Sequence, residues 1–357
     1  MKSKSLNANY HVGKIEDDTH LEDVYLLWRS VFGENFKAEA KYDWFYRSNV
    51  TSSGRIYLLF NGAQSSLVGV QGIAPRSWRI ASQGTTVKQS QVGLLLDIAV
   101  DAQHRTLGPA LKMIKNALGS EEQNFVIYYA FPNEKSETIF KRIGFKELGQ
   151  FKRFVKVLRF NKYLQKHVSQ PIANIIAAIL NAGAYLKDWF MLFIVRRTFR
   201  GELVTRFDKR FDDLWDDSNR TSDIIANRDA KSLQWYFGAN PIYDTKTFVA
   251  INNADDSYIG YVVFRRTQKN DVIIYDFFSR DSGKMLGVTL LLFVECIRKF
   301  DAGSITVGCH VSKQIEQQLK KVGFSCRDSR PIIYKVNNPA LAIDLNAIYL
   351  TSYDKDQ

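Results

Sequence analysis

The sequence predicts an α/β protein built from two similar halves. The chain has 357 residues, which suits two ordinary domains better than one. Short β-rich runs alternate with helical patterns of ten or more residues, as in α/β folds. Hydrophobic residues make up 45% of the chain, which allows substantial cores and excludes a disordered or fibrous protein.

An internal repeat supports this organisation. FKRIGF at 140–145 matches LKKVGF at 319–324, at an offset of 179 residues. At this offset no gap is needed, and the identical pairs fall at glycines, a strand end and matched helix positions: Asp97/Asp276, Leu107/Leu286, Gly108/Gly287, Leu111/Leu290, Glu137/Glu316, Lys141/Lys320, Gly144/Gly323 and Phe145/Phe324. We therefore expect a structural duplication.

Both copies show the order strand, turn, helix, strand, helix, Gly-Phe. In the first copy we predict strands at 93–100 and 124–131 and helices at 108–118 and 135–143. The counterparts in the second copy are strands at 271–278 and 304–311 and helices at 286–300 and 312–322. YDWFYRSN at 42–49 also resembles LQWYFGAN at 233–240, and we expect Trp44 and Trp235 to be core residues.

The predicted domain boundaries follow from the repeat. We assign 10–158 to a first domain, 159–205 to a basic helical linker and 206–345 to a second domain.

The linker and its surroundings are strongly basic. Residues 152–210, the basic collar, contain thirteen Lys or Arg and three acids, a local charge of +10 in a chain of net charge +12. Such a local excess suggests an anionic membrane surface, an acidic substrate or an RNA.

A long apolar helix is predicted inside the linker, at 171–197. Asn174, Asn181 and Asp188 are spaced seven apart and form one polar stripe on it. Polar residues interrupt it too often for a bilayer span. We expect the helix to be packed between the domains, and the alternative is that it lies in a membrane interface with its basic flanks toward lipid headgroups.

The predicted location is cytoplasmic, with membrane association through the basic collar as an option. The N-terminal run MKSKSLNANYHVGK has no apolar core of a signal peptide. The three cysteines show no CxxC spacing, so we expect a reducing compartment, no disulfide framework and no metal site.

The turn QHRTLGPA at 103–110 is the main functional signal. Its loop amides can converge on one point, to which the helix N-terminus adds its positive end. Gly108 permits close approach of a ligand, Pro109 suits the first helical turn, and Arg105 adds a cation. The turn therefore suits a diphosphate, although this stretch alone is also compatible with a plain strand-to-helix connection.

The pattern V-x-x-x-x-R-x-x-G-x-A, at Val100, Arg105, Gly108 and Ala110, resembles the acyl-CoA loop of the GCN5-related N-acetyltransferase (GNAT) superfamily. That family continues with a strand, an Asn and a helix ending in aromatic-x-x-x-Gly-Phe, which resembles FVIYYAF, Asn133 and FKRIGF here. The resemblance implies a mixed sheet flanked by helices in a tandem arrangement. The second copy resembles the family less, since its turn lacks the Arg and Ser312 replaces Asn133. We therefore expect the second copy to form one wall of the acceptor site without binding CoA.

The resemblance implies acetyl-CoA as co-substrate and a set of contacts to it. Backbone groups of the strand end would pair with the pantetheine arm like an added strand, the turn amides would hold the diphosphate, and Asn133 would contact the arm where two strands separate. The implied cofactor-binding residues are Ile98, Ala99, Val100, Gln103, His104, Arg105, Thr106, Leu107, Gly108, Pro109, Ala110, Asn133 and Phe140.

Three residues are candidates for catalysis. Family members often carry a Tyr at the position of Phe140 to protonate the departing thiolate, so Tyr128, Tyr129 or water would have to replace it. Asp97 is a candidate base or amine anchor, because an unpaired carboxylate in an apolar strand is costly to bury. The alternative is a structural Asp97 satisfied by backbone donors, which the matching Asp276 favours.

We therefore expect an acyl-CoA-dependent N-acyltransferase that acts on a small-molecule or glycan amine. The basic collar favours an anionic acceptor, such as a nucleotide-linked or lipid-linked amino sugar precursor of a surface polysaccharide. One alternative is a tRNA-dependent aminoacyl transferase of the related tandem fold. Such an enzyme needs no CoA turn, so a nucleic-acid partner is not expected. The other alternative is a non-catalytic acyl-CoA-binding or scaffold protein.

Overall fold

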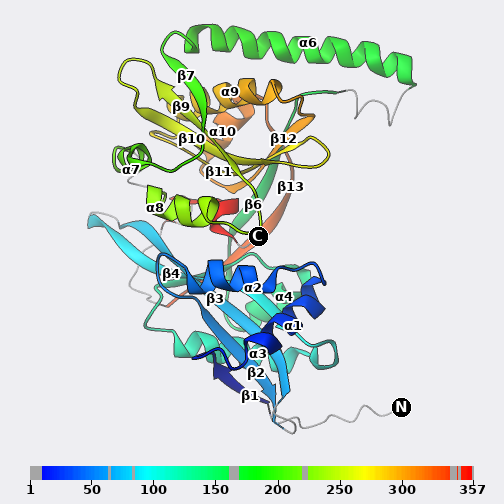
Figure 1. The fold of residues 1–357 in the computed structure, drawn as a ribbon, viewed down its shortest axis with the longest axis vertical. Coiled ribbons are helices and arrows are strands. Elements are labelled where there is room, and N and C mark those ends of the chain that lie inside the picture. The colour runs from blue at the N-terminus through cyan, green and yellow to red at the C-terminus, as the bar shows by residue number, and fades with distance from the viewer. Residues whose placement is uncertain are drawn as a thin grey trace.

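The computed structural model describes residues 10–62, 66–82, 85–160, 169–218, 224–337, 344 and 347–355. Among these residues one 14-stranded mixed sheet runs through both halves of the molecule, and helices cover its faces (Figure 1). The predicted α/β class, with a mixed sheet flanked by helices, is confirmed.

The elements of the two halves follow one another in similar order. The first half contains β1 (Tyr10–Lys14), α1 (Leu21–Phe32), α2 (Ala38–Lys41), a π-helical turn (Tyr42–Arg47), β2 (Arg55–Asn61), β3 (Ser66–Ser82), β4 (Thr85–Val100), α3 (Leu107–Ser120), β5 (Ile127–Ala130), α4 (Glu134–Arg142) and β6 (Lys146–Val157). After α6 (Gln170–Val195), the second half contains β7 (Phe199–Val204), α7 (Lys209–Asp216), β8 (Ile224–Ala226), α8 (Ala230–Leu233), a π-helical turn (Gln234–Gly238), β9 (Lys246–Asn252), β10 (Tyr258–Arg266), β11 (Val272–Ser279), α9 (Lys284–Arg298), β12 (Ser304–His310), α10 (Lys313–Val322), β13 (Ser325–Val336), β14 (Ile348–Thr351) and a 3-10 turn (Ser352–Asp354).

Local sequence signals explain where these elements begin and end. Asn133 caps α4 through a capping box, in which its side chain accepts from the first-turn amides. Gly323 ends α10 in the left-handed conformation, with φ 100°, and Gly144 follows α4 with φ 89°. The strands and helices predicted around both turns are present at the predicted places.

The last strands of the two halves are exchanged. The strand order is β1-β2-β3-β4-β5-β13-β6-β12-β11-β10-β9-β7. β13 comes from the second half but pairs with β5, whereas β6 comes from the first half but pairs with β12. β6 and β13 also pair with each other in the middle. The order is symmetrical about this central pair, which is the pattern that a duplicated unit would produce.

The two π-helical turns meet at the junction of the halves. Trp44 and Trp235 are both buried, as predicted. The indole nitrogen of Trp44 donates to the carbonyl of Trp235 at 2.8 Å, and the indole nitrogen of Trp235 donates to the carbonyl of Trp44 at 3.0 Å. This reciprocal pair joins the halves through matched positions of the repeat.

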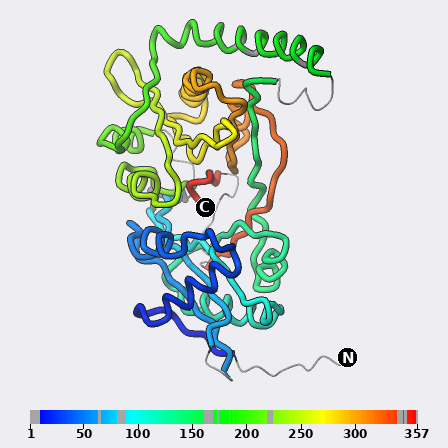
Figure 2. Tube along the Cα trace, turned by 45° about the vertical axis from the view of Figure 1, so that its right-hand side comes forward, coloured from blue at the N-terminus to red at the C-terminus, as the bar shows by residue number. Residues whose placement is uncertain are grey.

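The C-terminal segment also lies between the halves (Figure 2). β14 pairs with β12 on one side and with β8 on the other, and β8 pairs with β3 of the first half. Beneath the segment, the guanidinium of Arg228 donates to Asp276 and, at 2.7 Å, to Asp354. All three side chains are fully buried, so they depend on one another for charge compensation.

Three sequence expectations differ from the structure. β7 falls in the predicted linker but is an edge strand paired with β9, and β14 lies beyond the predicted end of the second domain at 345. The prediction that the long apolar helix is packed between the domains is wrong, because α6 lies along the outside of the second half (Figures 1 and 2). Among the described helices, α6 alone is long and apolar enough to cross a membrane.

Removing the buried cation at the junction should destabilise the whole molecule. Arg228→Ala leaves two buried carboxylates without their partner, so we expect the free energy of unfolding to fall by about 3–5 kcal/mol. The matched control is Arg153→Ala, which removes an ion pair with Asp328 at the surface and should cost less than about 1 kcal/mol. Urea denaturation measures both variants, and equal effects would contradict the interpretation.

Candidate active site

β4 and β5 separate after a short parallel pairing. The pairing ends at Leu94 and Tyr129, while β4 continues to Val100 with β3 on its other edge. Among the described strands, none pairs with the β5 side of β4 beyond Leu94. The gap between these two strands, here called the first slot, therefore offers an open backbone edge that an extended ligand can join. Ile98, Ala99 and Val100, predicted as contacts to the pantetheine arm, lie at this edge.

β4 also bulges within the slot. Asp97 and Ile98 together oppose the single β3 residue Gln71. Asp97 has φ 51°, in the left-handed region, which Asp tolerates better than most residues. The bulge bends the strand and turns the Asp97 side chain toward α2 and the π-helical turn.

The carboxylate of Asp97 is held in a buried ion pair. Lys41 Nζ donates to Oδ1, and the hydroxyl of Tyr46 donates to Oδ2 at 2.7 Å. The indole nitrogen of Trp28 donates to the backbone carbonyl of Asp97 at 3.2 Å. The Lys41 and Asp97 side chains are only 2% and 3% exposed. This geometry favours the structural alternative for Asp97, with side-chain donors in place of the predicted backbone donors, and its role as base stays a prediction.

Half of the turn amides are already used within the turn. The amide of Gln103 donates to Asp101 Oδ1 at 2.8 Å, and the amide of His104 donates to the Asp101 carbonyl at 2.9 Å. The amide of Thr106 donates to the His104 carbonyl at 2.7 Å. These three amides are therefore not available to a diphosphate in this conformation. Fewer turn amides can bind the diphosphate than the sequence predicted.

The other three amides of the turn make no hydrogen bond within it. Thr106 makes no capping hydrogen bond to α3, and the first amides of a helix have no acceptor inside it. In the part of the chain that the structure describes, the amides of Arg105, Leu107 and Gly108 have no acceptor. A Cβ at Gly108 would meet nothing within 4 Å, so neither packing nor backbone conformation requires glycine there. The helix N-terminus is thus open to an anion.

Neighbouring side chains fix the turn instead of facing a ligand. Arg105 Nε donates to the Val100 carbonyl at 2.8 Å, which places a guanidinium at the strand end. His104 Nδ1 lies 2.8 Å from the hydroxyl of Tyr10. Pro109 and Ala110 are buried in the helix face that packs on the sheet. Of these predicted contacts, Arg105 alone combines positive charge with exposure.

The two cofactor contacts predicted beyond the turn also have structural roles. The Asn133 Oδ1 accepts from the amides of Lys135 and Ser136, at 3.1 Å and 2.9 Å, and the side chain is exposed. Phe140 is buried beside Phe145, with ring centroids 5.1 Å apart. The burial of Phe140 counts against a contact with acyl-CoA, and that contact stays a prediction.

Tyr128 and Tyr129 point to opposite faces of the sheet, as neighbours in a strand must. Tyr128 lies under α3, where its hydroxyl approaches the Leu118 carbonyl at 3.4 Å. Tyr129 donates to the Asp354 carbonyl at 2.7 Å. Burial raises the pKa of both hydroxyls above the ordinary value, so neither gives up its proton readily. Their role as acids stays a prediction, and the position of Tyr128 counts against it.

The corresponding gap in the second half is filled. β11 and β12 also pair briefly and separate after Ile274 and Val307. β14 enters there, pairs with Cys309 and His310 of β12, and approaches β11 through a bond from Thr351 Oγ1 to Asp276 Oδ1 at 2.6 Å. A strand of the protein itself therefore occupies the place that is open in the first half.

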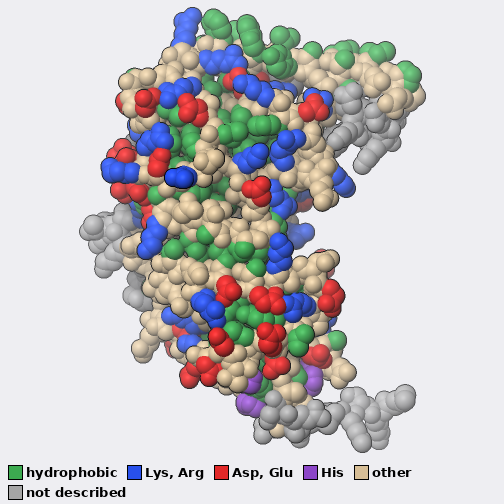
Figure 3. All heavy atoms as spheres, viewed as in Figure 1, with side chains coloured by type: hydrophobic (Ala, Val, Ile, Leu, Met, Phe, Trp, Pro, Cys, Tyr) green, Lys and Arg blue, Asp and Glu red, His purple; other side chains and the backbone are tan. Residues whose placement is uncertain are grey.

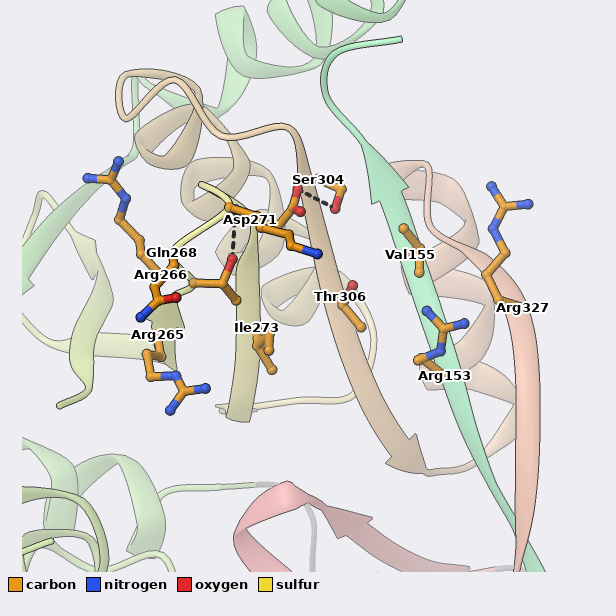
Figure 4. A pocket seen from close by; sticks show the side chains of 12 residues that line it. Arg153, Val155, Arg265, Arg266, Gln268, Asp271, Ile273, Ser304, Thr306 and Arg327 are labelled. Atoms are coloured by element: carbon orange, nitrogen blue, oxygen red, sulfur yellow. Dashed lines mark hydrogen bonds between the residues drawn. The ribbon is translucent and has the colours of Figure 1, made fainter. Parts of the chain in front are cut away.

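A basic basin lies on the second half, on strands far apart in sequence (Figure 4). It has a volume of 1010 Å³, and its lining combines five cations with a single acid: Arg153, Arg265, Arg266, Lys269, Arg327 and Asp271. The sequence repeat gave no hint of the basin, because its cations come from β6, β10, β13 and a hairpin loop that meet only in the fold.

By contrast, the basic collar is largely neutralised. In the described part of the collar, eight cations form ion pairs: Lys152 with Glu316, Arg153 with Asp328, Lys156 with Asp188, Arg159 with Asp301, Arg196 with Glu295, Arg200 with Glu202 and Asp256, Lys209 with Asp213, and Arg210 with Asp208. Several of these acids lie outside 152–210. Over the part of 152–210 that the structure describes, ion pairs therefore compensate most of the local charge excess.

The buried pair beneath the slot can be tested by a double-mutant cycle. Asp97→Ala removes the buried carboxylate to which Lys41 donates, so we expect the free energy of unfolding to fall by about 3–5 kcal/mol. Lys41→Met combined with Asp97→Leu leaves no buried charge and should recover most of that loss. An Asp97→Ala protein that keeps its stability but loses acyl transfer would instead support the role of base.

Comparisons with known proteins agree with this geometry. Residues 14–148 match the family model described as Acetyltransferase (GNAT) domain. No curated protein sequence is significantly similar to the chain. A GCN5-related N-acetyltransferase from Anabaena variabilis superimposes with a TM-score of 0.62 at 12% identity, over 92% of this chain and 73% of that chain.

Two other solved structures share the fold. A probable N-acyltransferase of unknown function from Enterococcus faecalis has a TM-score of 0.61 at 12% identity, over 92% of this chain and 72% of that chain. A glucosamine N-acetyltransferase region of a fungal multi-domain β-N-acetylglucosaminidase has a TM-score of 0.55 at 11% identity, over 92% of this chain and 38% of that chain. The open slot and the turn lie inside residues 14–148, the segment of this chain that matches the GNAT acetyltransferase domain.

Proposed function

We propose that the protein is an acyl-CoA-dependent N-acyltransferase whose first slot takes acetyl-CoA as co-substrate. The observation that carries this proposal is the coincidence of an open β4 edge with three unused amides and an exposed glycine at its end. The edge suits the amide-rich pantetheine arm, and the amides of Arg105, Leu107 and Gly108 suit the diphosphate.

The reaction follows from how the slot would position the thioester. The neutral amine nitrogen attacks the acyl carbon to form the C–N bond and the C–S bond breaks. The nitrogen gives up its extra proton to water, and the departing thiolate takes a proton from a nearby acid or from water. Holding both reactants in place supplies much of the rate, and no covalent enzyme intermediate is needed. Tyr129 is the better placed of the two proposed acids, because the strand pairing ends at this residue and the slot begins there.

The acceptor we propose is an amino sugar carried on an anionic group. Rings of Tyr129, Phe131 and Phe151 form a row with centroid separations of 6.0 Å and 5.2 Å. Arg153, at the edge of the basin, is two residues beyond Phe151 on the same face of β6. A sugar ring can stack on the half-buried Phe131 and Phe151 of this row while its diphosphate reaches Arg153, since two residues of an extended strand span about 7 Å.

A non-catalytic acyl-CoA-binding protein is the second candidate. The observation that favours it is the lack of an accessible acid, since Phe140 has no hydroxyl and Tyr128 and Tyr129 are fully buried. The neutralised collar counts against a tRNA-dependent aminoacyl transferase, because such an enzyme needs unpaired cations along an RNA backbone.

Calorimetry with acetyl-CoA tests the proposal directly. We expect one site per chain, because a protein strand fills the second gap. Gly108→Trp should abolish binding by filling the space above the turn. The matched control is Gly119→Trp, at the other end of α3, where an added Cβ also meets nothing within 4 Å. Absence of binding to the unmodified protein, or equal loss in both variants, would overturn the assignment of the first slot.

The acceptor proposal has its own test, in steady-state kinetics with UDP-glucosamine and free glucosamine. Replacing Arg265 and Arg327 together with Ser should raise KM for UDP-glucosamine about tenfold through lost charge contacts, and should leave KM for acetyl-CoA unchanged. Arg47→Ser, an exposed cation of the first half, is the control. Equal use of both sugars by the unmodified enzyme would contradict recognition of an anionic group.

A further inference from the structure

α6 turns its apolar face to solvent. Eleven of the fourteen large hydrophobic side chains that are exposed in the described residues lie on this helix: Ile172, Ile175, Ile176, Ile179, Leu180, Tyr185, Leu186, Trp189, Phe190, Phe193 and Ile194. Figure 3 shows such side chains along the top of the molecule. A surface helix ordinarily places its apolar face against the core, and an exposed apolar area of this size marks an interaction site.

Asn181 and Asp188 of the polar stripe face the protein instead, whereas Asn174 is exposed. Asn181 Oδ1 accepts from the amide of Phe160 at 3.0 Å. Asp188 accepts from Lys156 at 3.0 Å and from Arg298 at 2.6 Å. Asp188 is the sole acid in the sequence of the helix, and its side chain is 4% exposed. The outward face of α6 therefore carries no acid and is fixed in orientation by buried charges.

Both ends of α6 lead back into one sheet, so the helix cannot span a bilayer. Its length and composition would allow a span. However, β6 before it and β7 after it belong to the same sheet. A span would force one connecting segment to return through hydrocarbon with unpaired backbone groups, and would carry the ion pairs of Asp188 into lipid. The helix, about 39 Å long, can only lie parallel to a membrane surface.

We propose that α6 docks this protein in the interface of an anionic lipid bilayer. Tyr185 and Trp189, four residues apart, form one edge of the apolar face, as aromatic residues do at membrane interfaces. Arg197 is exposed just beyond the helix, and Lys162 and Lys166 precede it in the sequence. The net charge of +12 attracts the chain to anionic headgroups and repels a second copy, which favours lipid over self-association.

Co-sedimentation with vesicles tests the docking. We expect the full chain to bind vesicles of phosphatidylcholine mixed with phosphatidylglycerol, and to bind pure phosphatidylcholine more weakly. Replacing Ile179, Leu186 and Phe190 together with Ser should weaken binding about a hundredfold, since three exposed side chains lose their burial in lipid. The control is Leu26→Ser on α1, because Leu26 is 61% exposed, as is Leu186.

Several outcomes would overturn the proposal. These are no binding of the unmodified chain, unchanged binding of the triple variant, or equal binding to both kinds of vesicle. A dimer in sedimentation equilibrium that the triple variant dissociates would show that a second copy covers the face. If the triple variant fails to fold, quenching of tryptophan fluorescence by brominated lipid still tests the docking. Brominated lipid should quench the unmodified chain and should quench Trp189→Phe less. No quenching of the unmodified chain would refute the docking.

Discussion

The pairing of β6 with β13 is the constraint on which the rest of the molecule depends. Each strand leaves the half that encodes it and completes the sheet of the other half, so neither sheet has its full set of strands alone. The exchange brings matched tryptophans into contact and places the C-terminal segment between the halves. It also determines where the two gaps open. An exchanged strand pairs with one edge of β5 and of β12, so each of these strands can separate from its other neighbour, β4 or β11.

The two gaps show how one geometry can serve two purposes. Strands that separate leave backbone donors and acceptors without partners, and such groups must be satisfied. In the second half, β14 satisfies them from within the chain and locks the gap through Thr351, Asp276 and Arg228. In the first half the edge stays open beside a helix N-terminus, so it can pair with something from outside. A binding site and a structural joint thus differ mainly in what fills the gap.

Local features were readable in the sequence, and features that depend on distant contacts were not. Apolar periodicity and glycines located β4, α3, β5 and α4, because these signals act over a few residues. The turn between β4 and α3 was located from the sequence, but which of its amides are unused depends on Asp101 and His104 bonding within it. The pair of Asp97 with Lys41 joins residues from separate elements, and no short-range pattern specifies it. The stripe on α6 was recognised, yet periodicity gives the faces of a helix and not which face meets protein.

The exchange of strands also orders events during synthesis. β5 leaves the ribosome long before β13, so the first half spends much of translation with an unprotected sheet edge. A fragment that ended after β6 would keep that edge permanently and would add a second strand, β6, that lacks both of its neighbours. Such a fragment contains the whole matched acetyltransferase segment and is nevertheless a poor candidate for an independent folding unit. In this chain the boundary of a sequence family and the boundary of cooperative folding do not coincide.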